Sequence, residues 1–298
     1  MDTSELDAGS GGTKIGGFAS RIGLLIGTNI AVIALFTVVA SVLGVEPRGI
    51  VGLTIFSALF GFGGAFVSLL MSKKMAIRST GAVVIEHPRN DSERWLVDMV
   101  ARLATDAGID MPDVAIFNSP APNAFATGAK RNDSLVAVSI GLLERMTAEE
   151  VEAVLAHEIA HVANGDMVTM TLLQGVVNTF VILISRLLAN VVTNVLGRDG
   201  RGTYFIVVML LQVVLGFFAS MIVMWFSRHR EFRADRDAGT LTSNTAMISA
   251  LQVLQRQQSD DILPEQVAAF GIRASQSQGL RKLLASHPPL EDRIAALR

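Results

Sequence analysis

The segment His157-Glu158-Ile159-Ala160-His161 contains the residue types of a catalytic metal site. The preceding residues, 151–156, favour a helix, and two histidines four residues apart lie on one face of a helix, about one turn from each other. Both imidazoles can therefore bind one zinc ion, and Glu158 can take a proton from a water molecule beside the metal. Because so short a pattern also arises by chance, its context decides whether it predicts a site with one zinc ion per chain.

A third protein ligand is needed for a catalytic zinc ion, and the segment around residue 231 can supply it. The chain has no cysteine, which excludes thiolate ligands. Glu231 and Asp235 share one face of an expected helix. We expect Glu231 to complete the site and Asp235 to accept the second N–H of a ligand histidine, which fixes its tautomer. His229 is the competing ligand, but on a helix it points away from Glu231.

The composition is that of a membrane protein. Charged residues make up 17% of the chain, whereas a soluble domain has about 25%, and the mean hydropathy is positive. The 25 basic and 27 acidic residues give no general attraction to nucleic acid, and no basic, aromatic-rich patch is present. We therefore expect contact with a lipid bilayer and no nucleic-acid partner. The lack of cysteine suits a reducing compartment.

Four apolar runs are candidates to cross the membrane. Residues 22–45 and 50–71 are each long enough, and a short polar turn separates them. A signal peptide is a poorer interpretation of the first run, because a long tail precedes it and the second run follows at once. Residues 204–226 form a clean fourth run. Glycines in the second run would allow close helix packing: Gly61, Gly63 and Gly64.

The third run, residues 167–196, is unusually long and contains Arg186. One span could end near Arg186, with the remainder lying at the membrane interface. The whole run could also bend into a hairpin or line the catalytic cavity. Residues 167–226 must leave the histidine helix and return to it, which agrees with two crossings. It agrees equally with no crossing, if both runs pack on the membrane surface.

The basic residues indicate an orientation. Most of those next to the apolar runs lie on one side of them: Lys14, Arg21, Lys73, Lys74, Arg78, Arg228, Arg230, Arg233 and Arg236. The connections on the other side carry only Arg48, Arg198 and Arg201. Because basic residues stay on the cytoplasmic side, we expect both histidines in the cytoplasm, close to the membrane.

A small globular region separates the second run from the third. Its residue patterns predict strands at 81–85, 112–117 and 134–140 and a helix at 92–107. Thr147 and Glu150 form a capping box that begins the helix of the two histidines. Asn164-Gly165-Asp166 we expect to end that helix rather than to act in catalysis. The predicted fold is therefore mainly α with a small β-sheet, an α+β membrane protein.

Four stretches resemble the HtpX family of membrane zinc metalloproteases, relatives of the CAAX prenyl endopeptidases. They are Ala156–Met167, Glu231–Asp235, Asn123–Gly128 and Ser286–Arg293. The resemblance implies zinc-dependent endoproteolysis of misfolded or damaged membrane proteins at the cytoplasmic face of a bacterial inner membrane, with induction by heat or envelope stress. The tail before the first span is longer than the family leads us to expect, but no site residue lies in it.

The resemblance implies a zincin-like fold, and the apolar runs divide the chain into five expected segments. These are an N-terminal tail (1–21), a transmembrane hairpin (22–71), a catalytic domain with the histidine helix (72–166), an apolar or transmembrane pair (167–226) and a C-terminal catalytic region that supplies the third ligand (227–298).

Further site residues are expected in these stretches. Asn123, Ala124 and Phe125 begin an edge strand expected to pair with extended substrate, although a plain turn is the alternative. His287 precedes two prolines and is expected to donate a hydrogen bond to the oxyanion of the reaction, with a purely structural turn as the alternative. Arg293 could pair with Asp235 or Glu231.

A membrane scaffold that keeps zinc without turnover is the main alternative function. Glu158 favours the protease, because a scaffold does not need a base. A metal transporter suits the sequence less well, since the expected ligands lie outside the spans. Substrate identity and oligomeric state stay open, a homo-oligomer included.

Overall fold

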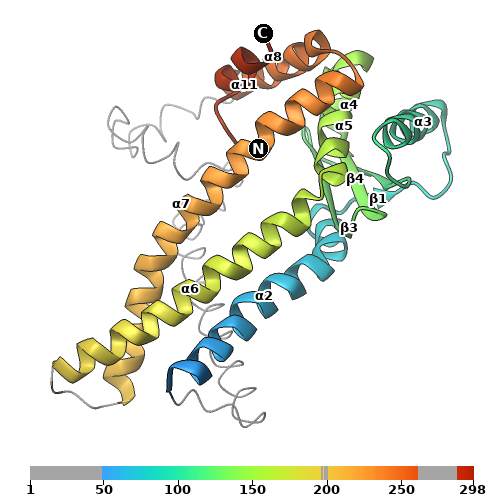
Figure 1. Ribbon diagram of the computed structural model, residues 1–298. Coiled ribbons are helices and arrows are strands. Elements are labelled where there is room, and N and C mark those ends of the chain that lie inside the picture. Colours follow the sequence, from blue (N-terminus) through green and yellow to red (C-terminus); the bar gives the residue numbers. More distant parts are fainter. Residues whose placement is uncertain (1–48, 196, 198–200, 261–286) are drawn as a thin grey trace, which may run out of the picture. The chain divides into compact units, whose positions relative to one another are not determined.

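The computed structural model describes residues 49–195, 197, 201–260 and 287–298 (Figure 1). These residues form mainly helices with one small sheet, which confirms the predicted fold class. The tail and the first predicted span, residues 1–21 and 22–45, lie outside the described residues. The chain up to Phe56 and the chain from Ser57 form separate compact units, and the second unit contains the site.

A four-stranded sheet forms beside the helix of the two histidines. Its strands are β1 (Val83–Val84), β2 (Asp113–Phe117), β3 (Ala124–Lys130) and β4 (Asp133–Ser139), in the order β1-β2-β4-β3. β2 and β4 are parallel, whereas β1 and β3 are antiparallel to their neighbours. β3 therefore lies at an edge of the sheet, as the edge-strand prediction requires. β1 is shorter than predicted.

Helix α5 (Ala148–Ala163) carries both histidines and packs on the sheet. It begins with the predicted capping box: the Thr147 hydroxyl accepts a hydrogen bond from the Glu150 N–H, and Glu150 accepts one from the Thr147 N–H. The main core lies between α5, the sheet, α3 (Asp91–Asp106) and α8 (Asn244–Asp260). Leu155 and Ile159 are fully buried in it, so the core fixes how α5 is turned.

Two long helices follow α5. α6 (Asp166–Val195) starts after Gly165, whose φ of +66° is a left-handed conformation that favours glycine. α6 continues as one helix past Arg186, so the run does not bend into a hairpin there. α7 (Arg201–Leu241) then returns along α6, and the two helices lie side by side (Figure 1).

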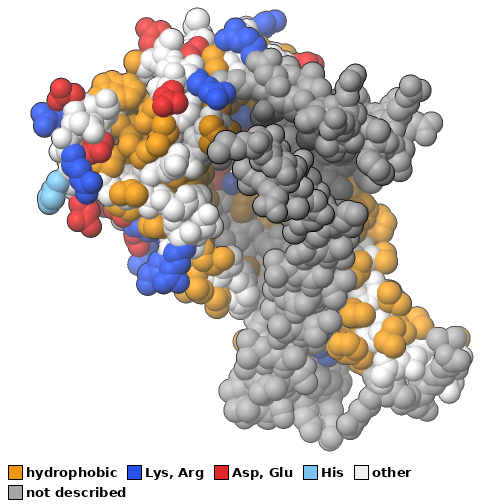
Figure 2. All heavy atoms as spheres, turned by 180° about the vertical axis from the view of Figure 1, so that it is seen from behind, with side chains coloured by type: hydrophobic (Ala, Val, Ile, Leu, Met, Phe, Trp, Pro, Cys, Tyr) orange, Lys and Arg blue, Asp and Glu red, His pale blue; other side chains and the backbone are white. Residues whose placement is uncertain are grey.

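Three described helices are long and apolar enough to cross a membrane: α2 (Gly49–Thr80), α6 and α7. Large apolar side chains on α6 and α7 are exposed, among them Phe180, Leu210 and Phe218. In Figure 2 the part of these helices that is drawn in colour shows mostly orange and white, whereas charged side chains gather over the sheet-bearing part. This distribution suits contact with lipid tails along the two helices.

Helix α7 continues without a break from its apolar part into the segment with Glu231 and Asp235. The boundary expected between residues 226 and 227 therefore falls inside one helix, and the boundary expected after residue 71 falls inside α2. The chain closes with the short helix α11 (Leu290–Leu297), which packs on α7 and α8. Another short helix, α4 (Ile140–Arg145), connects β4 to α5.

Candidate metal centre and active site

Three buried side chains from two helices converge on one point. The Nε2 atoms of His157 and His161 are 3.1 Å apart, and they lie 3.5 and 3.3 Å from the two carboxylate oxygens of Glu231. An ion bound tetrahedrally at about 2.0–2.1 Å separates its ligand atoms by about 3.3 Å. The spacing and the donor set, two imidazoles and one carboxylate, therefore fit one zinc ion.

His157 turns its other ring nitrogen toward Asp235. The distance from His157 Nδ1 to Asp235 Oδ1 is 2.9 Å, and both residues are buried. Arg293 of α11 donates two hydrogen bonds to the same carboxylate, from Nε at 2.8 Å and from Nη2 at 2.6 Å. A buried two-pronged ion pair of this kind fixes the carboxylate and, through it, the histidine ring. Arg293 also lies 3.6 Å from Glu231.

His161 has an equivalent partner that the sequence interpretation missed. Its Nδ1 lies 2.6 Å from Oδ2 of Asp166, a fully buried residue at the start of α6. Arg233 of α7 donates a hydrogen bond to the other oxygen of Asp166. The segment 164–166 had been expected only to end α5. Gly165 has a left-handed backbone conformation that changes the direction of the chain after α5. Asp166 therefore lies next to His161, in the last turn of that helix.

The carboxylates change the proton affinity of both rings. Burial disfavours the charged form of His161, but hydrogen bonds with Asp166 and Glu231 outweigh it and raise the pKa of His161 to about 9. The pKa of His157 is raised for the same reason: burial opposes the charge, but hydrogen bonds with Asp235 and Glu231 outweigh it. A site that stabilises positive charge between these rings suits a bound cation.

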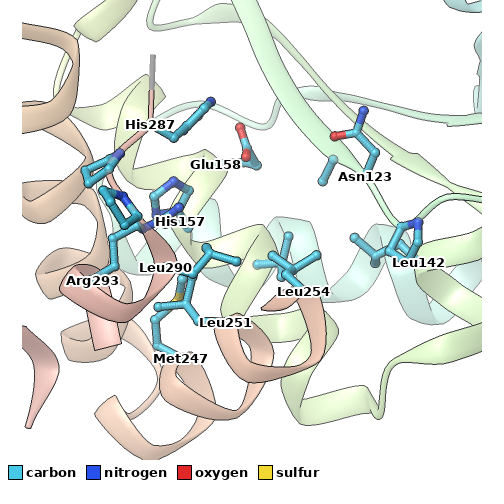
Figure 3. A pocket seen from close by; sticks show the side chains of 15 residues that line it. Asn123, Leu142, His157, Glu158, Met247, Leu251, Leu254, His287, Leu290 and Arg293 are labelled. Atoms are coloured by element: carbon cyan, nitrogen blue, oxygen red, sulfur yellow. Dashed lines mark hydrogen bonds between the residues drawn. The ribbon is translucent and has the colours of Figure 1, made fainter. Parts of the chain in front are cut away.

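Glu158 lies beside the cluster without belonging to it. Its Oε2 accepts a hydrogen bond of 2.9 Å from the backbone N–H of Ala126 in β3. Glu158 also lines the cavity in front of His157 (Figure 3). The edge strand thus fixes one oxygen of this carboxylate at a position close to the three candidate metal ligands.

The residues predicted to bind substrate are only partly brought to the cavity. Asn123 and Ala124 line it, from the entry to β3 (Figure 3). The Phe125 side chain lies elsewhere, with its ring 5.6 Å from that of Phe117 in the smaller core on the other face of the sheet. The structure therefore does not bring Phe125 to this site.

His287 lies at the solvent-exposed edge of the cluster. Its Nδ1 is 2.6 Å from Oε2 of Glu231, while 62% of its side chain is exposed. His229, the alternative third ligand, is not part of the cluster: its Nδ1 is 2.9 Å from the backbone oxygen of Trp225. Of the two candidates on α7, Glu231 is therefore the one that faces the histidines.

A cavity of about 550 Å³ opens in front of His157 and Glu158. In Figure 3, His157, His287 and Arg293 gather on one side of it, and Leu142 and Asn123 lie on the other. Side chains of α8 line the region between them, and sequence reasoning did not single these out. Their only signal was an amphipathic pattern, which a plain core helix has too.

The chain is similar to known proteins over most of its length. A family model described as Peptidase family M48 matches residues 90–298. The chain is 56% identical over 284 residues to a protein named Protease HtpX from Stenotrophomonas maltophilia (strain R551-3), which covers 94% of this chain and 98% of that protein. A protein of the same name from Xanthomonas campestris pv. campestris (strain B100) is 56% identical over 283 residues and covers 94% of this chain.

Among solved structures, the chain is similar to the crystal structure of S. mikatae Ste24p, with a TM-score of 0.65 and 18% sequence identity. The match covers 95% of this chain and 66% of that protein, so this chain spans slightly less than two thirds of its length. At this level of identity the likeness concerns the fold.

Proposed function

The chain belongs to peptidase family M48 and is a membrane metalloprotease, and from this premise we propose that it is a zinc-dependent endopeptidase of misfolded or damaged membrane proteins. The observation that carries the proposal is the convergence of His157, His161 and Glu231 at spacings that suit a tetrahedral zinc site, with Glu158 next to them. We assign the first three as ligands of one zinc ion per chain and Glu158 as the general base.

Zinc, when bound, supplies Lewis acidity that polarises the scissile carbonyl and makes a water molecule acidic enough to attack near neutral pH. The chain's own contribution begins with orientation. Asp235 and Asp166 hold the two histidine rings with Nε2 facing inward, and Arg293 and Arg233 hold these carboxylates.

Glu158 then moves the proton. Because the Ala126 N–H holds Oε2, the other carboxylate oxygen is the atom that we assign to take the proton of the attacking water. Glu158 delivers this proton to the nitrogen of the leaving amine, which allows the peptide bond to break. We assign to His287, at the mouth of the cluster, a hydrogen bond to the oxygen of the carbonyl as negative charge develops there.

Substrate binding is assigned to the edge of β3. An extended peptide can add to the outer side of an edge strand through backbone hydrogen bonds, which recognise any sequence in an unfolded segment. Asn123 and Ala124 lie where such a peptide would pass Glu158. Broad recognition of extended chains suits a protease that removes misfolded proteins.

The location is proposed from charge and hydropathy. α6 and α7 connect the site directly to the expected bilayer, and basic residues follow the apolar part of α7 on the side of the site. We infer that the protein is a multi-pass protein of a bacterial inner membrane whose catalytic domain faces the cytoplasm. In the domain organisation that we propose, residues 72–166 and 227–298 form the catalytic part, 22–71 and 167–226 the membrane part, and 1–21 a tail.

The proposal is tested with an unfolded membrane-protein reporter and the purified protein in detergent. We expect cleavage with zinc, loss of cleavage with excess chelator, and recovery after zinc is returned. Glu158→Gln should bind zinc as the wild type does but cleave at least about 1,000-fold more slowly, because the base is lost. Cleavage that persists in the chelator, or in Glu158→Gln, contradicts the proposal. Full zinc binding without any cleavage would instead favour a scaffold.

A further inference from the structure

Helix α6 carries two amide side chains in the middle of its apolar stretch. Gln174 and Asn178 are four residues apart, so they share one face of the helix. With a rise of about 1.5 Å per residue, they lie about 12 and 18 Å from Asp166, where α6 begins. The hydrocarbon core of a bilayer is about 30 Å thick, so in a helix that crosses it both amides fall near the centre. Polar groups at this depth are costly unless other polar groups bind them.

The two amides satisfy each other only in part. Gln174 Nε2 donates a hydrogen bond of 2.7 Å to Oδ1 of Asn178. Within the described part of the chain, this is the only hydrogen bond of the two side chains, and both are partly exposed. The side-chain oxygen of Gln174 and the side-chain nitrogen of Asn178 therefore offer an acceptor and a donor next to each other. Thr171, one turn earlier, is different, because its hydroxyl donates to the Met167 oxygen of its own helix.

The packing of α2 does not cover this face of α6. α2 approaches α6 most closely at Gly61, where a Cβ atom would lie 2.8 Å from the Gly175 backbone oxygen and would also meet Thr179. Gly175 and Thr179 each follow one of the amide residues by one position, which turns them by about 100° around the helix. α2 therefore packs on a neighbouring face, and the two amides keep their partial exposure.

The same helix leads to the catalytic centre. α6 begins at Asp166, whose carboxylate lies 2.6 Å from His161 Nδ1, and α6 also packs on β3. A membrane segment that lies along α6 at the level of the amides therefore leaves the bilayer beside the edge strand. The chain that continues from this segment can add to β3 in an extended form and pass Glu158. The docked span and the cleaved stretch are then two parts of one substrate.

We propose that Gln174 and Asn178 form a docking site for a membrane span of the substrate and select spans with a polar side chain, such as Asn, Gln, Ser or Thr, near their middle. Such a side chain can donate to the Gln174 oxygen and accept from the Asn178 nitrogen, which lipid tails cannot do. The inference rests on the proposed function, because it names the membrane proteins that are brought to Glu158. It also gives misfolding a chemical meaning: a span whose polar residue has lost its partner helix exposes the group that these amides bind.

The test uses the full-length, zinc-loaded protein in vesicles of phosphatidylethanolamine and phosphatidylglycerol. The reporter has one apolar span, with either Asn or Leu at its centre, and an unfolded tail on the side of the site. A hydrogen bond between membrane helices changes binding by about 3–10-fold, so kcat/KM should be higher by this factor for the Asn reporter.

Two variants show whether the amides are the cause. Gln174→Leu combined with Asn178→Leu should lower kcat/KM for the Asn reporter to the value for the Leu reporter, while the protein still binds one zinc ion. Asn190→Leu, which removes an exposed amide further along α6, should keep the preference. Equal kcat/KM for the two reporters, a preference that survives in the double variant, or a zinc-loaded double variant that cleaves neither reporter overturns the inference while the proposed function stands. Absence of any wild-type cleavage overturns both.

A second readout does not depend on turnover, and it separates the competing occupants of this face. The chain has no cysteine, so Val181→Cys, on the face of the amides, can be paired with a single cysteine beside the central Asn of the reporter. In the Glu158→Gln background this disulfide should form, whereas Phe180→Cys, exposed on the opposite side of α6, should give little. A disulfide between two copies of Val181→Cys instead, or one with Asn29→Cys of the same chain, would mean that another helix occupies the face, and it would overturn the inference.

Discussion

At the scale of single residues, each histidine of the cluster repeats the same arrangement. Its outer nitrogen faces a buried carboxylate, and an arginine from a distant part of the chain holds that carboxylate. For His157 the pair is Asp235 and Arg293, and for His161 it is Asp166 and Arg233. The arginines hold the carboxylates in place, so the inward-facing nitrogens are oriented before any metal binds.

Asp166→Asn tests the role of Asp166, the partner of His161 that the sequence did not predict. The amide keeps the size of the side chain but removes the charge that holds His161 and pairs with Arg233. We expect zinc affinity to fall by about 10–100-fold, measured by competition with a coloured chelator.

The matched control for that variant is Asp237→Asn, which removes a carboxylate 2.7 Å from Asn164 at the same corner but away from both histidines. It should bind zinc like the wild type. Equal affinities for Asp166→Asn and the wild type would show that Asp166 does not position His161.

Spacing alone was enough to name the two histidines, Glu158, Glu231 and Asp235, because positions four apart on a helix share a face. Asp166 could not be, because its approach to His161 depends on a single left-handed residue, Gly165. The direction of the Phe125 side chain could not be predicted, because the face of a strand depends on its register, which the sequence of β3 does not settle.

At the scale of elements, the site depends on how α5 begins and on what it packs against. Glu150 closes the capping box and also accepts a hydrogen bond of 2.6 Å from Ser249 of α8. Burial alone would raise the pKa of Glu150, but the hydrogen bonds from Ser249 and Thr147 outweigh it and lower the pKa. One carboxylate thus connects the start of the histidine helix to the helix that lines the cavity.

Glu150→Gln should therefore destabilise the protein in a pH-dependent way. A lowered folded-state pKa stabilises the fold above the unfolded value of about 4.3, and this contribution disappears as pH falls through the folded value. We expect a loss of about 1 kcal/mol at pH 7 that vanishes toward pH 3, measured by thermal unfolding in detergent. The exposed neighbour serves as control: Glu149→Gln should have little effect. A difference that stays constant with pH would contradict the assignment.

The close approach of α2 and α6 gives a second element-scale prediction. A Cβ atom at Gly61 would overlap the Thr179 side chain and lie 2.8 Å from the Gly175 backbone oxygen, whereas one at Gly63 would meet nothing within 4 Å. Gly61→Leu should force the helices apart and cost about 1–3 kcal/mol, seen as a lower unfolding temperature. Gly63→Leu should unfold like the wild type. Equal effects of both variants would mean that the helices do not pack at Gly61.

Apolar periodicity predicted the positions of the helices well, but it predicted the residues at which they begin and end less well. The predicted helix at 92–107 differs from α3 by one residue at each end, and the predicted strand at 112–117 differs from β2 by one residue at its start. By contrast, residues 204–226 and the Glu231 segment were treated separately, although α7 includes both. Charged residues after an apolar run mark the membrane surface, but they do not end a helix.

At the scale of the whole molecule, the membrane helices and the site are one structure. α6 begins at Asp166, which orients His161, and α7 carries Glu231 on the same helix as its apolar part. Three members of the ion-pair network around the histidines, Asp166, Arg233 and Asp235, therefore lie on the two candidate membrane helices where these pack against α5. We therefore propose that the site acts close to the bilayer surface.

The proposed orientation can be measured directly because the chain has no cysteine. Single cysteines at Asn132, in the exposed turn between β3 and β4, and at Val195, the exposed end of α6, report the two sides. In intact cells an impermeant maleimide should label Val195→Cys, and it should label Asn132→Cys only after lysis. The reverse pattern would place the catalytic domain outside the cytoplasm.

The central claim is that His157, His161 and Glu231 hold one zinc ion while Glu158 acts on substrate without binding the metal. Zinc content per chain, measured by elemental analysis after dialysis, tests it most directly. We expect one zinc ion in the wild type and in Glu158→Gln, and strongly reduced zinc in Glu231→Gln and His161→Ala. Full zinc content in Glu231→Gln, or its loss in Glu158→Gln, would contradict the assignment of these residues.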